Sequence, residues 1–197
     1  MSGAVPRLTP QLIERIQYHD LPFVVLTDCL SSWISALVVW HSNLREHVKH
    51  DYSHAMMWTV PGHFASQGVT YESIPMDRYL GGQHRVKLWH RPDWDCVAKS
   101  RIRASVRQAL NEPWQRRRYD VLGILGQWLY SLTGVGRGVN RGNRYYCSER
   151  VRSHLVDEAI SLKHPSPADL DRYFEDSPDW QCYGVYDPEL EAKRESA

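Results

Sequence analysis

Residues 145–151, YYCSERV, are the most informative stretch of this 197-residue chain, because two aromatic residues lead directly into a cysteine. Val151, Leu155 and Ala159 then recur four residues apart, which predicts a helix beginning near Cys147. Backbone N–H groups and the dipole at a helix N-terminus favour the thiolate, the form of cysteine that attacks carbonyl carbons. Cys147 is therefore a candidate nucleophile, with the backbone N–H of Ser148 as part of an oxyanion site.

A cysteine nucleophile needs a base, and His54 is the best placed of the ten histidines. It follows Tyr52 and Ser53 and leads into the apolar run 55–60, which predicts a strand. Backbone pairing in a strand would fix the direction of the imidazole, as a base requires.

A histidine base also needs an acceptor that fixes its tautomer. We expect a second strand over 69–73 after a long turn, which makes Glu72 a candidate cross-strand neighbour of His54. Gln67 and His63 are the alternatives for this third position.

The rest of the chain predicts one α+β domain, in which helices flank a small antiparallel sheet. Further helices are expected over 9–18, 31–40, 96–110 and 121–132, and further strands over 22–27 and 85–90. The expected organisation is an N-terminal helix extension over 1–20, a catalytic domain over 21–174 and an acidic C-terminal tail over 175–197.

Composition excludes some classes of protein. The aromatic content of 11% argues against disorder, and the most apolar run, 33–40, is too short to span a membrane. The first residues lack the apolar core of a secretory signal, so a cytoplasmic location is the default expectation. The four cysteines lie far apart, which favours free thiols over disulfides or a zinc site.

Two other kinds of binding site are disfavoured. Arginines at 101–118 and 137–144 suggest phosphate contacts, but the first group fits the wet face of an amphipathic helix, so a nucleic-acid partner is not expected. A histidine cluster suggests zinc, but no H-E-x-x-H motif accompanies it. The cluster comprises His41, His47, His50 and His54. We expect no metal and no organic cofactor.

The order of these motifs resembles the circularly permuted branch of the NlpC-type papain-like cysteine peptidases and amidases, which includes the bacterial YiiX-like proteins. In that branch the histidine strand comes first and the cysteine helix last, and here 93 residues separate His54 from Cys147. Supporting matches run from about residue 21 to about residue 174. They are Tyr52-Ser53-His54, Glu72 and YYCSERV, with Asp28 after an N-terminal strand, Tyr119-Asp120 before an apolar segment and Pro167-Ala168-Asp169-Leu170 near the end.

The resemblance implies a permuted papain-like fold with Cys147 as nucleophile, His54 as general base and Glu72 as orienting group. It departs from the family pattern at Arg150, which we expect on the helix surface. Substrate contacts are expected from Ser148 and from three tyrosines, Tyr52, Tyr119 and Tyr146.

The implied activity is hydrolysis of amide bonds through a thioester, with peptidoglycan peptides as the substrate. Without a signal sequence, such an enzyme would reach the wall in a phage particle, through a secretion machine or by another non-classical route. The alternatives are an intracellular amidase or acyltransferase acting on a peptide or lipid amide, and a catalytically silent structural, virion or binding protein with the same fold.

Overall fold

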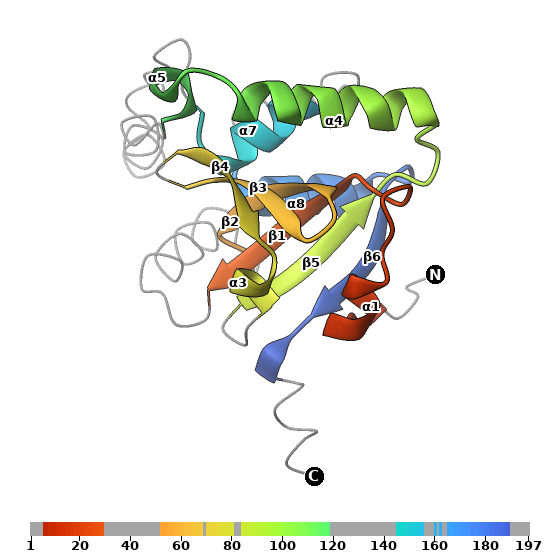
Figure 1. Ribbon diagram of the computed structural model, residues 1–197. Coiled ribbons are helices and arrows are strands. Elements are labelled where there is room, and N and C mark those ends of the chain that lie inside the picture. Colours follow the sequence, from red (N-terminus) through yellow and green to blue (C-terminus); the bar gives the residue numbers. More distant parts are fainter. Residues whose placement is uncertain are drawn as a thin grey trace, which may run out of the picture.

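The computed structural model describes residues 6–29, 52–68, 70–80, 84–118, 145–155, 160, 162 and 165–189. Six strands form one antiparallel sheet in the order β4-β3-β2-β1-β5-β6, which confirms the α+β class (Figure 1). The strands are β1 (Phe23–Cys29), β2 (His54–Val60), β3 (His63–Gln67), β4 (Tyr71–Pro75), β5 (His84–His90) and β6 (Gln181–Tyr186).

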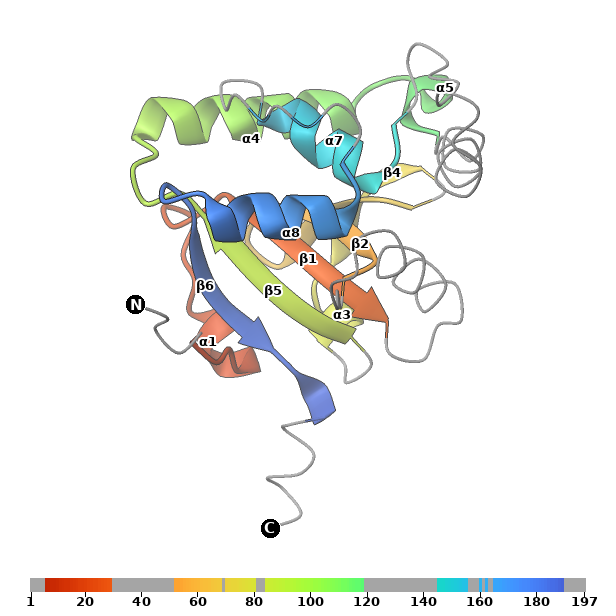
Figure 2. The same cartoon turned by 180° about the vertical axis from the view of Figure 1, so that it is seen from behind.

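Helices lie on both faces of the sheet. They are α1 (Pro10–Glu14), α3 (Asp77–Leu80), α4 (Cys96–Leu110), α5 (Trp114–Arg117), α7 (Cys147–His154) and α8 (Pro167–Asp176). Figure 2 shows α4, α7 and α8 over one face, and Figure 1 shows α1 and α3 over the other. The helix expected over 96–110 is confirmed, and Asp95 caps it by accepting a hydrogen bond from the Ala98 amide.

Alternation along the central strands explains why both faces are covered, because successive side chains point to opposite sides. In β1, Val24 and Leu26 join the apolar cluster beneath α4, α7 and α8. Phe23 and Val25 join the second cluster, with Ile13 of α1 and the residues that flank it. A strand buried on both faces reads as a continuous apolar run, and the run at 22–27 predicted β1 correctly for that reason.

The turn after β2 is shorter than the sequence suggested. Only Pro61 and Gly62 separate β2 from β3, and Gly62 has a φ of 75°, which a residue without a side chain adopts easily. The expected hairpin between 55–60 and 69–73 is therefore wrong, because β3 lies between β2 and β4.

The C-terminal region contributes to the domain. Ser166 and Asp169 form a reciprocal capping box that starts α8, and β6 pairs with β5 along its length. The buried Lys87 ammonium of β5 lies 2.8 Å from Asp171 Oδ1 of α8, which ties this helix to the sheet. Residues 181–186, which were expected in an acidic tail, thus form a strand of the sheet.

The N-terminal segment extends the sheet beyond β6. The Leu8 amide donates to the Val185 carbonyl, and the Val185 amide donates to the Pro6 carbonyl, both at 2.9 Å. The helix expected over 9–18 is present in shorter form as α1, capped by Thr9. The helices expected over 31–40 and 121–132 lie outside the described residues, and within the described part no helix is long and apolar enough to cross a membrane.

Gly184 offers a test of this N-terminal contact. A Cβ at this position would lie 2.7 Å from Leu8 Cγ and 2.8 Å from the Pro6 carbonyl oxygen, so a side chain would displace the segment. We expect Gly184→Ala to lower the free energy of unfolding by about 1–3 kcal/mol, measured by urea denaturation. Gly68→Ala is the control, since its Cβ would meet nothing closer than 3.9 Å. Equal effects of the two substitutions would contradict this account.

Candidate functional site

Cys147 is the first residue of α7, as the sequence predicted. Tyr146 is the N-cap in extended conformation, and it provides no side-chain hydrogen bond to the helix amides. The sulfur receives hydrogen bonds from the backbone of Ala55 and Ser148, each of which lowers the pKa of the thiol. The nucleophile candidate therefore lies against the first residues of β2, and its side chain is 4% exposed.

His54 is the residue immediately before Ala55. Its Nε2 lies 2.9 Å from the hydroxyl oxygen of Ser66 on β3. Burial raises the pKa of the Tyr79 phenol on α3, and a hydrogen bond with Ser66 opposes part of this rise. Ser66 therefore joins Tyr79 to the imidazole of His54.

The faces of β2 explain how these groups are arranged. Ala55 and Met57 lie in the apolar cluster that includes Val151 of α7, whereas Met56 belongs to the opposite cluster. By alternation, His54 points to the side of Met56, where α3 lies. Among the described contacts no hydrogen bond joins Cys147 to the His54 ring; the sulfur instead contacts the backbone of Ala55, the next residue along β2.

Glu72 does not lie beside His54 in the sheet. It pairs with Ser66, while His54 pairs with Thr27 of β1. Glu72 is exposed. The expected cross-strand contact between Glu72 and His54 is absent because β3 separates their strands.

The two alternatives for the third position have other environments. Gln67 is buried and donates from Nε2 to the Arg117 carbonyl at 2.8 Å. His63 is exposed at the start of β3. Sequence reasoning missed Ser66 because it missed β3. The signal was Pro61-Gly62, since a two-residue turn after β2 would have placed residue 66 near residue 54.

Burial sets the protonation states of the central pair. It raises the pKa of the Cys147 thiol, and this effect exceeds that of the backbone hydrogen bonds. Burial also lowers the pKa of His54 to about 4, with a smaller contribution from a charge on His84. Both shifts favour uncharged groups, so the resting site holds a thiol and a neutral imidazole. The sequence had suggested a thiolate stabilised by the helix.

Further polar groups surround this pair at the end of β1. Ser53 donates to Asp28 Oδ1 at 3.0 Å. His84 lies opposite Cys29 at the start of β5, and burial lowers its pKa while the Asp28 backbone and carboxylate raise it. The ring of His84 packs against Tyr79 with centroids 4.9 Å apart. The carboxyl end of β1 therefore adds an acid and a second histidine to the site.

The expected substrate contacts have different outcomes. Ser148 is fully buried, and its hydroxyl donates to the Pro165 carbonyl at 2.6 Å. Both its backbone and its side chain also hydrogen bond the Cys147 sulfur. Tyr52 is a core residue whose ring lies 5.7 Å from the Lys87 ammonium. Tyr146 is 6% exposed. Tyr119 lies outside the described residues.

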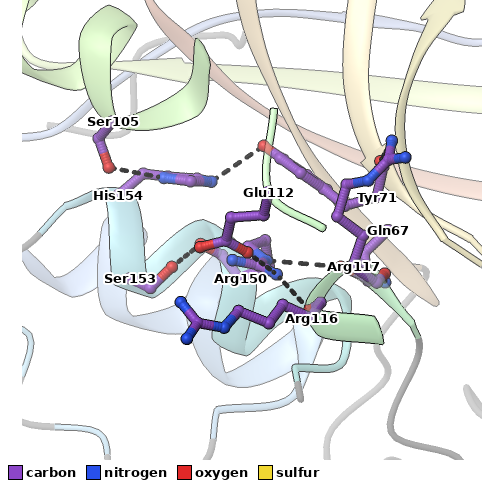
Figure 3. Close-up of polar contacts among 9 residues, drawn as sticks. All are labelled: Gln67, Tyr71, Ser105, Glu112, Arg116, Arg117, Arg150, Ser153 and His154. Carbon is purple, nitrogen blue, oxygen red and sulfur yellow. Dashed lines mark hydrogen bonds and ion pairs between the residues drawn. The ribbon is translucent and has the colours of Figure 1, made fainter. Parts of the chain in front are cut away.

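Arg150 is buried, contrary to the expectation of a surface position. It is 3% exposed, and its guanidinium lies 3.3 Å from the Glu112 carboxylate and 3.2 Å from the Arg116 carbonyl (Figure 3). The same guanidinium lies over the rings of Tyr71 and Tyr145. A helix of eight residues that packs against the sheet and other helices leaves little wet surface at this position.

Another histidine, His154, belongs to the polar network around Arg150 that Figure 3 shows. His154, in the last turn of α7, contacts the Tyr71 hydroxyl through Nε2 and the Ser105 hydroxyl through Nδ1, both at 2.9 Å. Burial and, to a smaller extent, the charge on Arg150 lower the pKa of His154 to about 3. A neutral ring between two hydroxyls has a structural role: it joins α7 to α4 and β4.

Cys96, Cys147 and Cys182 are free thiols. Within the described residues, no group of three or more histidine, cysteine, aspartate or glutamate side chains is arranged to hold a metal ion. His41, His47 and His50 lie outside the described residues. Comparison of the sequence with protein-family models and with curated proteins gives no match.

The protonation states predict the alkylation behaviour of Cys147. Because burial raises the pKa of its thiol, the rate of carboxamidomethylation should still be increasing at pH 9 and should be lower than that of exposed Cys96 at neutral pH. Iodoacetamide labelling followed by peptide mass spectrometry measures both sites in one sample. A rate for Cys147 that levels off below pH 7 would show a resting thiolate instead.

The buried ion pair predicts a large effect of Arg150→Met. Removal of the guanidinium leaves Glu112 without its partner, so we expect a loss of about 3 kcal/mol in the free energy of unfolding. Arg107→Met, at an exposed position of α4, should change it by about 0.5 kcal/mol or less. Urea denaturation compares the two variants, and similar losses would contradict a structural role for Arg150.

Proposed function

We propose that this protein is a thiol hydrolase of amide bonds with a permuted papain-like fold. The observation that carries the proposal is the meeting of Cys147, at the start of α7, with the first residues of β2, where His54 is held by Ser66. The order of the histidine strand and the cysteine helix along the chain supports the same conclusion, as does the sequence resemblance.

The chemistry begins with a neutral pair. The Cys147 sulfur attacks the carbonyl carbon while His54 takes the thiol proton, so charge develops only as the bond forms. The backbone N–H of Ser148 and its neighbours at the start of α7 stabilise the oxyanion. Collapse of the tetrahedral intermediate breaks the C–N bond, and the imidazolium gives its proton to the leaving amine.

The second half of the reaction regenerates the enzyme. The thioester on Cys147 is attacked by water, which gives a proton to His54 as the new C–O bond forms. Breakage of the C–S bond returns the proton to the sulfur and releases a carboxylic acid. These steps need only the two side chains and the helix amides.

The proposed substrate class is cell-wall peptide. Stem peptides of peptidoglycan carry several carboxylates, and exposed arginines of α4 and α5 provide positive charge on the domain. Arg118 lies over the ring of half-exposed Trp114, with the guanidinium carbon 4.3 Å from the ring centroid. Delivery to the wall in a phage particle or through a secretion machine belongs to the same proposal.

The burial of Cys147 favours a second candidate, a binding protein that keeps the fold without the chemistry. A side chain that is 4% exposed, with a raised thiol pKa, is also what a structural cysteine shows. The two candidates differ in one measurable property, which is the release of fragments from a substrate.

The test is incubation of purified peptidoglycan with the wild-type protein, Cys147→Ala and His54→Gln, followed by mass spectrometry of soluble fragments. Only the wild type should release peptides. Both single losses should exceed about a hundredfold, because a nucleophile and a general base each contribute at least that much.

The pH dependence supplies a second criterion. Activity requires neutral His54, whose pKa is about 4, so the rate should be constant from about pH 5 to neutral and should fall below about pH 4. Cys96→Ala, which removes an exposed thiol, is the matched control and should keep full activity. Equal fragment release by the wild type and Cys147→Ala would exclude the hydrolase.

A further inference from the structure

Positive charge is concentrated in α4, α5 and the residue that follows α5. Residues 96–118 hold seven basic side chains and one acidic side chain, although the net charge of the whole chain is only +1. The single acid, Glu112, already has a partner in buried Arg150, whose guanidinium lies 3.3 Å from its carboxylate. This part of the domain therefore carries positive charge that its own acid does not neutralise, and such a patch attracts anionic polymers.

Three of the basic side chains hold α4 and α5 to the rest of the domain. Lys99 donates to the carbonyl of His19 at 2.9 Å, and Arg103 donates to two carbonyls in the segment between α1 and β1. Arg117 donates to the carbonyl of Tyr71 at 3.3 Å. These contacts to backbone oxygens explain part of the basic group by a structural role, without any ligand.

Three other arginines have no such role. Arg107 lies in the last turn of α4, and Arg116 and Arg118 belong to α5 and its C-cap, which follow after a short connection. All three are exposed, and their side chains form no hydrogen bond or ion pair with any residue that the structure describes. Figure 1 shows α5 beyond the C-terminal end of α4, so these cations are gathered at one corner of the domain.

An exposed tryptophan lies at the same corner. Trp114 is the first residue of α5, and its side chain is 51% exposed. The guanidinium carbon of Arg118 lies 4.3 Å from the centroid of its ring. The backbone of Arg118 forms a bridge with that of Thr70, just before β4, which anchors the pair to the sheet. A half-exposed indole beside a stacked cation is an arrangement on which unpaired nucleobases stack.

We propose that these four side chains, Arg107, Trp114, Arg116 and Arg118, form a surface that binds single-stranded nucleic acid. The arginines contact phosphates, which the planar guanidinium group binds well, and Trp114 stacks on a base. A duplex fits this surface less well, because its bases are stacked on one another and offer no free face to the indole. The inference goes beyond the proposed function and does not depend on it.

The test is the fluorescence anisotropy of a labelled oligothymidylate of about 12 nucleotides, titrated with the full-length protein at salt concentrations from about 50 to 200 mM. The variants are Arg107→Gln, Arg116→Gln, Arg118→Gln and Trp114→Ala. All four positions are exposed, so the variants should retain the fold. Arg15→Gln is the matched control, because Arg15 is also exposed but follows α1 on the opposite face of the sheet.

We expect each of the three arginine variants to reduce the slope of log affinity against log salt by about 0.7, the effect of one lost phosphate contact. Trp114→Ala should weaken binding by about fivefold to a hundredfold and leave the slope unchanged, because stacking releases no counterions. Arg15→Gln should bind as the wild type does. Cys147→Ala should also bind as the wild type does, so failure of the hydrolase and failure of this inference are distinguishable.

Four results would each overturn the inference. The first is the absence of binding by the wild type. The second is an equal effect of Arg15→Gln and Arg107→Gln, which would indicate diffuse attraction by the whole surface. The third is full affinity in Trp114→Ala, which would leave a site for any polyanion. The fourth is tighter binding to phosphatidylserine vesicles than to the oligonucleotide, which would assign the surface to a membrane.

Discussion

The packing of α7 against the first residues of β2 is the constraint on which the candidate site depends. It brings the Cys147 sulfur to the backbone of Ala55, the residue that follows His54, although the two segments are far apart in the chain. The helix is held in this position by its own buried polar groups. Arg150 bonds to Glu112, and His154 bonds to Tyr71 and Ser105, so β4, α4 and the segment that follows α4 fix its orientation.

Sequence patterns predicted the parts of the fold whose apolar spacing is strong. The run at 22–27, the alternation at 85–90 and the helical stripe at 96–110 all correspond to observed elements. Strand β3 was missed because HFASQ is short and has only one large apolar residue. Strand β6 was missed because its residues lie in an acidic region, and its place in the sheet depends on pairing with β5, which no local pattern reveals.

The positions of the candidate nucleophile and base could be predicted from the sequence, but the hydrogen-bond partner of the base could not. Placement of Cys147 at a helix start and of His54 at a strand start follows from local spacing. The partner of His54 depends on strand order. Because β3 was not recognised, exposed Glu72 was predicted to contact His54, whereas buried Ser66 does so in the structure. Protonation states were misjudged for a related reason, since the desolvation that dominates at Cys147 and His54 comes from tertiary packing.

The bridge between residues 6–8 and β6 has a consequence for handling the protein. It occupies the amide and carbonyl of Val185 at the outer side of β6, where the sheet would otherwise end with open hydrogen-bonding groups. Truncation of the first eight residues would expose this edge and remove buried Leu8 from the apolar cluster that it joins. An unprotected edge of this kind recruits strands from other copies, so shortened forms would be prone to self-association.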